Sequence, residues 1–130
     1  MIILDADNVD MIKEVFCGRD KVVTLDYDDT LIEKTGKFDR RNKLFYLLCQ
    51  MCEVWIVTSR PHIVYETEFA YDDMISYLKD IRLNIDGLVY NAGNKEILRC
   101  RWINPICHFE DDLLTTVRLT RLGVPVWYAG

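Results

Sequence analysis

Residues 21–31 read KVVTLDYDDTL, an apolar run followed by three aspartates and a threonine. Its first part is rich in β-branched and apolar residues, as is typical of a strand that is covered on both faces. Similar short runs recur along the chain with amphipathic helical stretches between them, and this alternation indicates a parallel sheet. We therefore expect an α/β fold in which the aspartates follow the C-terminal end of a central strand.

Short apolar runs predict five strands, at residues 22–26, 54–58, 87–90, 106–110 and 124–128. Apolar residues at three- and four-residue spacing predict helices at residues 39–52, 72–81, 95–102 and 113–122. Asp72 and Asp73 suit the start of the second helix, and Gly123 suits the C′ position of the last. The sequence thus predicts one domain over residues 1–130 with a five-stranded, mainly parallel sheet.

The first 20 residues hold a short apolar run and then a helical pattern that ends before Gly18. We interpret residues 1–20 as an N-terminal extension, and the sequence does not indicate its role.

Composition narrows the class of protein. The chain has 130 residues, is 50% hydrophobic and carries a net charge of −5, which fits one compact domain without a broad nucleic-acid surface. Five cysteines, an odd number without a signal-peptide pattern, favour a reducing, cytoplasmic setting. We interpret Cys49 and Cys52 as buried structural thiols, and we expect no membrane span because no apolar run approaches about 20 residues.

Asp26 and Asp28 are the residues that most directly indicate chemistry. Ligands of open α/β sheets bind at the carboxyl ends of strands. An Asp-x-Asp spacing there can aim two carboxylates at one site while Tyr27 faces away. Two acids at one site suit binding of a hard metal ion and a division of roles between nucleophile and proton donor.

Here the chain resembles the haloacid dehalogenase superfamily, whose first motif is a hydrophobic strand followed by Asp-x-Asp-x-Thr/Val-Leu/Val. The matching residues are Asp26, Asp28, Thr30 and Leu31. Residues 5–9 also fit this pattern loosely, but only four residues precede them and a helical pattern follows at once. We therefore take the segment at Asp26 as the first motif.

Three further motifs of the superfamily are matched in order. Residues 54–61, VWIVTSRP, match a strand that ends in a hydroxyl residue, here Thr58, and Lys95 matches a lysine at the start of a helix. Residues 110–112 are three consecutive acids after an apolar strand. Spacing favours Asp111 as the first choice for the metal ligand and Asp112 as the second choice, and Glu110 takes over this role if the register shifts by one residue.

The resemblance implies a Rossmann-like, three-layer α/β/α domain and a Mg²⁺-dependent phosphomonoester hydrolase with an aspartyl-phosphate intermediate. It implies that Asp26 is the nucleophile and Asp28 the proton donor. The other implied sites are phosphate contacts at Asp29, Thr30, Thr58, Ser59 and Lys95, the catalytic set Asp26, Asp28, Thr58 and Lys95, and Mg²⁺ ligands at Asp26, Asp28, Asp111 and Asp112.

Little chain is left between the motifs for an inserted cap domain, so the resemblance implies a capless member with an open site. We expect a phosphorylated partner, either a small molecule or a nucleic-acid end, and candidate substrates are a polynucleotide 3′-phosphate, a nucleotide or a sugar phosphate. Arg60, His62 and Tyr65 are candidate contacts to a polymer. The alternative is a non-enzymatic module that binds phosphate or metal, either receiver-like or of the same superfamily. The sequence does not indicate an oligomeric state.

Overall fold

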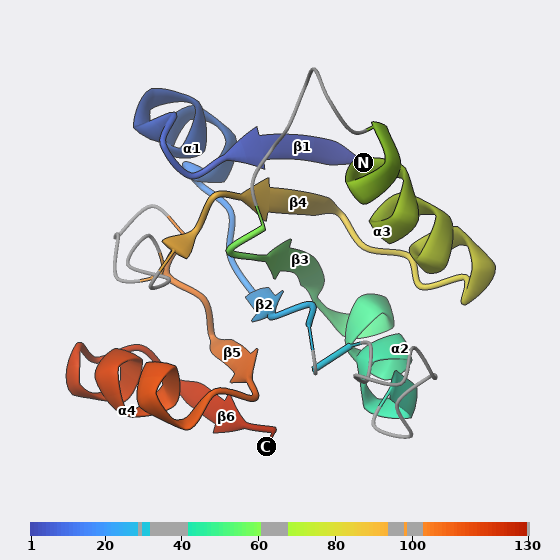
Figure 1. The fold of residues 1–130 in the computed structure, drawn as a ribbon. Helices are drawn as coiled ribbons and strands as arrows, with labels where there is room; N and C mark the ends of the chain where they lie inside the picture. The colour runs from blue at the N-terminus through green and yellow to red at the C-terminus, as the bar shows by residue number, and fades with distance from the viewer. Residues whose placement is uncertain (29, 32–41, 61–67, 94–97, 99–102, 130) are drawn as a thin grey trace.

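The computed structural model describes residues 1–28, 30–31, 42–60, 68–93, 98 and 103–129. Its centre is a parallel sheet of six strands in the order β1-β4-β3-β2-β5-β6 (Figure 1). The strands are β1 (Ile2–Asp5), β2 (Val22–Leu25), β3 (Glu53–Val57), β4 (Gly87–Tyr90), β5 (Cys107–Glu110) and β6 (Val126–Tyr128). The α/β class predicted from the sequence is confirmed.

Within the described part of the chain, four helices cover the sheet, two on each face: α1 (Val9–Phe16), α2 (Asn42–Met51), α3 (Glu68–Asp80) and α4 (Leu113–Arg121). On one face, Phe45 of α2 and Met74 of α3 pack into an apolar cluster with alternate residues of the strands. On the other face, Phe16 of α1 and Leu119 of α4 pack into a second cluster. Strands with both faces covered read as continuous apolar runs, which explains why the sequence predicted them well.

The prediction of five strands was wrong by one, because Ile2–Asp5, within the predicted N-terminal extension, form a sixth strand of the sheet. β1 pairs in parallel with β4, from Ile2 opposite Gly87 to Asp5 opposite Tyr90. The six-stranded sheet is parallel throughout rather than mainly parallel. A four-residue run at the start of the chain shows too little periodicity to be recognised as a strand.

A contact between aromatic rings and a glycine joins this N-terminal unit to the sheet. The fully buried ring of Trp55 in β3 lies over Gly87, and its centroid is 4.5 Å from that of Phe16 in α1. A Cβ at position 87 would overlap the Trp55 ring and lie 2.6 Å from the carbonyl oxygen of Ile2. Glycine in β4 therefore leaves room for the indole ring from β3 and for the close carbonyl group of β1.

The other differences lie at element boundaries. Helix α3 begins at Glu68, before the acidic pair expected at its start. The predicted helix at residues 95–102 lies outside the described residues apart from the buried Leu98. The last helix agrees well: Asp112 caps its N-terminus, and Gly123 follows the C-cap with φ +87°, a left-handed conformation that suits glycine.

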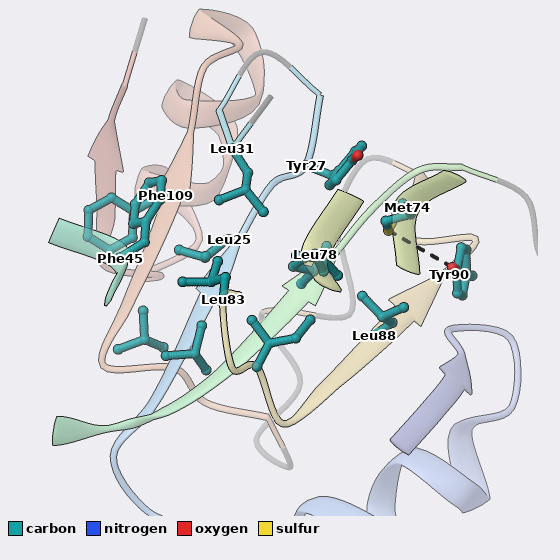
Figure 2. Close-up of a cluster of buried hydrophobic side chains, with 14 residues drawn as sticks. Leu25, Tyr27, Leu31, Phe45, Met74, Leu78, Leu83, Leu88, Tyr90 and Phe109 are labelled. Atoms are coloured by element: carbon teal, nitrogen blue, oxygen red, sulfur yellow. Dashed lines mark hydrogen bonds between the residues drawn. The ribbon is translucent and has the colours of Figure 1, made fainter. Parts of the chain in front are cut away.

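Aromatic residues order the core next to the ends of the central strands. Figure 2 shows Phe45 of α2 against Phe109 of β5, with ring centroids 5.4 Å apart at an interplanar angle of 79°. Tyr27 lies in the same cluster, just past the end of β2. This packing fixes the backbone from which the neighbouring acidic residues project.

The described cysteines, Cys17, Cys49, Cys52 and Cys107, are free thiols. Cys49 and Cys52 are half-buried rather than fully buried, and desolvation still raises the pKa of Cys49 to about 11, which fits an unreactive thiol. Among the described residues, no helix is both long and apolar enough to cross a membrane.

Candidate functional site

The strand order of the sheet reverses between β2 and β5, and the C-terminal ends of these two strands form its topological switch point. From β2 the chain runs through α2 to β3 and β4 on one side, whereas β5 runs through α4 to β6 on the other. The helices that follow β2 and β5 cover opposite faces of the sheet. Open α/β sheets bind ligands in the crevice at such a switch point.

Three carboxylates meet at this point. Asp26 follows β2, Glu110 ends β5 and Asp111 comes next, and one oxygen of each lies within 4.8 Å of the others. The side chains of Asp26 and Glu110 are buried, and Asp111 is partly exposed. Carboxylates this close repel one another unless a proton or a cation compensates their charge. An all-oxygen donor set of this kind fits Mg²⁺ or Ca²⁺.

The backbone of β2 and β5 holds two of these acids in place. The ladder between the strands continues past β2, where the Asp26 N–H donates to the Phe109 carbonyl at 2.9 Å. The chain then turns, because the N–H groups of Thr30 and Leu31 both donate to the Tyr27 carbonyl. This turn returns the buried Thr30 hydroxyl to Asp111 Oδ1, 3.3 Å away, across the switch point.

Glu110 belongs to a buried row of hydrogen-bonded polar side chains that also includes His108 and Thr24. The imidazole of His108, fully buried in β5, has Nδ1 2.8 Å from the Thr24 hydroxyl of β2 and Nε2 3.1 Å from Glu110 Oε1. The backbone N–H of Asp112 donates to the other oxygen, Glu110 Oε2, at 3.3 Å. Both carboxylate oxygens of Glu110 are therefore engaged by the protein on the side of β5.

The Asp28 carboxylate forms a salt bridge with Arg60. Arg60, in the loop after β3, donates from Nε to Asp28 Oδ2 at 3.0 Å and from an η nitrogen to Oδ1 at 2.6 Å. The guanidinium also lies over the Tyr27 ring, 4.9 Å from its centroid. The hydrogen bond to Asp28 is the main cause that raises the pKa of Arg60. As expected, Tyr27 itself is buried in the core.

Thr58 lies at the end of β3, next to β2. Its side chain is fully buried, and its hydroxyl oxygen accepts from the Arg60 N–H at 3.1 Å. Its backbone N–H donates to Val89 and its carbonyl accepts from Ala92, so the residue is tied to the end of β4. Ser59 next to it is exposed.

The Asp112 carboxylate is not one of the three clustered carboxylates. Its Oδ2 accepts from the N–H and the hydroxyl of Thr115, and these hydrogen bonds lower the pKa of Asp112. Its role in the structure is to cap α4. Two predicted residues, Asp29 and Lys95, lie outside the described residues, as do His62 and Tyr65.

The sequence interpretation missed His108, Thr24 and the pairing of Arg60 with Asp28. A usable signal existed for the first two, because polar residues inside otherwise apolar strands are unusual in a buried sheet. His108 and Glu110 are also two residues apart in a strand, so they share a face. No local signal indicates which acid Arg60 pairs with.

No protein-family model matches this chain, and no curated protein matches it either. The geometry of the site carries the functional interpretation.

Proposed function

We propose that this chain is a Mg²⁺-dependent phosphomonoester hydrolase of the haloacid dehalogenase superfamily, with Asp26 as the nucleophile. The observation that carries the proposal is the meeting of Asp26, Glu110 and Asp111 within 4.8 Å at the switch point of the sheet. An isolated acidic motif is commonly a solvated turn, but these acids come from two strands and two of them are buried. Burying them together is unfavourable unless a cation or a proton compensates their charge, and Mg²⁺ would do so.

Hydrolysis would proceed in two steps on the residues of this chain. In the first, an Asp26 carboxylate oxygen attacks phosphorus, the bond from phosphorus to the leaving oxygen breaks, and Asp28 gives that oxygen a proton. In the second, Asp28 takes a proton from water as the water oxygen attacks phosphorus, which releases phosphate and restores Asp26. The Thr58 hydroxyl would donate a hydrogen bond to a phosphoryl oxygen during both steps.

Asp26, Glu110 and Asp111 are the residues that would hold Mg²⁺. The bound ion would supply positive charge that offsets the repulsion between the Asp26 carboxylate and the phosphate. The Thr30 hydroxyl, which donates to Asp111, would keep one oxygen of that carboxylate oriented in the site.

The pair between Asp28 and Arg60 bears on this mechanism. Both Asp28 oxygens accept from Arg60, so the guanidinium holds the carboxylate in place, and opening of the pair would let it turn toward the leaving oxygen. A phosphate group that enters the site is a competing acceptor for the same guanidinium. Binding of the substrate would thus release the proton donor.

The same pair is also the observation that favours the second candidate function, a module that binds phosphate or metal without turnover. A receiver-like module is less well supported, because receivers share the strand order 2-1-3-4-5. Counted from β2, the order here is 3-2-1-4-5. The end of β4, where a receiver carries its phosphoacceptor, is Tyr90 followed by Asn91. Steady release of phosphate would separate an enzyme from a binding module.

The proposed substrate is a phosphomonoester on an accessible group: a polynucleotide 3′-phosphate, a nucleotide or a sugar phosphate. The proposal includes a capless, open site, based on the short chain lengths between the motifs. Arg60, half-buried beside Asp28, is the described cation best placed for an anionic substrate.

The test is release of inorganic phosphate with and without Mg²⁺, from an aryl phosphate, nucleotides, sugar phosphates and oligonucleotides phosphorylated at the 3′ or 5′ end. We expect Mg²⁺-dependent turnover of at least one class by the wild-type protein and none by Asp26→Asn. Asp5→Asn, in the other Asp-x-Asp segment, is the matched control and should keep turnover. Full activity of Asp26→Asn would reject the nucleophile, and no turnover on any class would favour the binding module.

A further inference from the structure

The buried polar chain from Thr24 through His108 to Glu110 has no role in the two hydrolytic steps. All three side chains are almost fully inaccessible to solvent, and they connect β2 to β5 through the interior. Buried polar groups in a sheet interior are costly unless each is satisfied, so their presence needs an explanation. We propose that His108, supported by Thr24, is a positioning residue that fixes Glu110 as a metal-binding carboxylate; this inference rests on the Mg²⁺ site proposed above.

The hydrogen-bonding capacity of the groups sets the orientation of the imidazole. An ionised Glu110 carboxylate only accepts, so His108 Nε2 must carry the proton that lies between them. The Thr24 hydroxyl can donate to a neutral Nδ1 or accept from a protonated one, so it suits either state of the ring. Thr24 therefore keeps the ring oriented with Nε2 toward Glu110 in either state of the ring.

Each of the two Glu110 carboxylate oxygens then accepts a hydrogen bond from the protein. Oε1 accepts from His108 and Oε2 accepts from the backbone N–H of Asp112. A glutamate has one more rotatable bond than an aspartate and loses more conformational freedom when it binds a metal ion. Orientation in advance by these two donors would remove part of that penalty, as carboxylate partners do for metal-bound histidines in other proteins.

Glu110 differs in this respect from its two neighbours in the cluster. Asp111 accepts a hydrogen bond from the Thr30 hydroxyl across the switch point. The backbone N–H of Asp26 donates to the Phe109 carbonyl. Glu110 is the carboxylate to which His108 is hydrogen-bonded, so removal of His108 should affect it most.

The experiment measures Mg²⁺ affinity directly, by calorimetric titration of the full chain without substrate, with Mn²⁺ binding by electron paramagnetic resonance as a second probe. We expect His108→Leu to weaken metal binding by about 10- to 100-fold. His108→Gln, whose amide nitrogen can replace Nε2 as donor, should restore most of the affinity. Thr24→Val should weaken binding less than His108→Leu, because the ring remains.

A double-mutant cycle separates positioning from general stability. Glu110→Gln removes the charge, so it should weaken metal binding by itself. If His108 acts through Glu110, then His108→Leu should cause no further loss of affinity in the Glu110→Gln background. Thermal unfolding of each variant, monitored by circular dichroism, identifies those that remain folded.

Unchanged Mg²⁺ affinity of folded His108→Leu, or additive losses in the cycle, would overturn the inference. Failure of the proposed function gives a different pattern. A wild-type protein that binds Mg²⁺ through Glu110 but releases no phosphate would reject the hydrolase and still allow the cycle to be measured. A wild-type protein that hydrolyses phosphomonoesters while His108→Leu keeps its metal affinity would reject this inference alone. Absence of Mg²⁺ and Mn²⁺ binding by the wild-type protein would reject both.

Discussion

Replacement of Asp111 by asparagine should make the metal-free protein more stable. Asp111 lies within 4.8 Å of two buried carboxylates, and two unit charges at that distance repel by about 3 kcal/mol at an effective dielectric constant of about 20. Protonation of one carboxyl and the partial exposure of Asp111 reduce this penalty. Asparagine keeps an oxygen that can accept from Thr30, so we expect a gain of about 1–3 kcal/mol in the free energy of unfolding.

The same substitution should remove the response to Mg²⁺. A ligand present at about 100 times its dissociation constant stabilises a folded protein by about 2.7 kcal/mol, and the wild-type protein should gain that amount. The assay is urea denaturation in EDTA and in Mg²⁺. Asp112→Asn is the matched control: asparagine is an equally good helix cap, so we expect a change of at most about 1 kcal/mol and a normal Mg²⁺ response.

The reasoning would be refuted if Asp111→Asn destabilised the metal-free protein, or if Mg²⁺ stabilised the variant as strongly as the wild type. A loss of the Mg²⁺ response in Asp112→Asn but not in Asp111→Asn would identify Asp112, the residue that caps α4, as the metal ligand in place of Asp111.

Three further predictions concern single residues. Gly87→Ala should lower the free energy of unfolding by about 1–3 kcal/mol in urea denaturation, because the methyl group would overlap the ring of Trp55; wild-type stability would contradict this packing. Thr58→Val should lower kcat/KM for phosphate release by about 100-fold with unchanged circular dichroism, and an unchanged kcat/KM would exclude the hydroxyl from the site. Asp112→Ala should cost about 1 kcal/mol at neutral pH through loss of the helix cap. Because hydrogen bonds from Thr115 lower the pKa of Asp112, that difference should be complete above pH 3.8 and shrink as the pH falls through the lowered native pKa; a difference independent of pH would contradict it.

The sequence was most informative where the signal is local. Strands covered on both faces are continuous apolar runs, and the helix after Asp112 has both its cap and its C′ glycine in sequence. The meeting of Asp26 with the acids after β5 was also predictable, because parallel strands bring their carboxyl ends to one edge of the sheet.

Long-range pairings were not accessible in the same way. Nothing near Arg60 in the sequence indicates that its partner is Asp28, 32 residues away. Of the three consecutive acids, Glu110 and Asp111 reach the site while Asp112 caps a helix, and a shift of one residue at the end of a strand changes which side chain reaches the site. β1 was missed because its role depends on the edge of β4, which the run of four residues does not reveal.

The most direct test of the central claim is to trap the covalent intermediate on Asp26. Wild-type protein would be mixed with a phosphomonoester and Mg²⁺, then quenched with borohydride, which reduces an acyl phosphate to an alcohol. Peptide mass spectrometry should then find homoserine at position 26, in the wild type and not in Asp26→Asn or in protein without substrate. Phosphate release by the wild type with homoserine at another aspartate, or with none under conditions that trap an acyl phosphate, would contradict the assignment of Asp26 as the nucleophile.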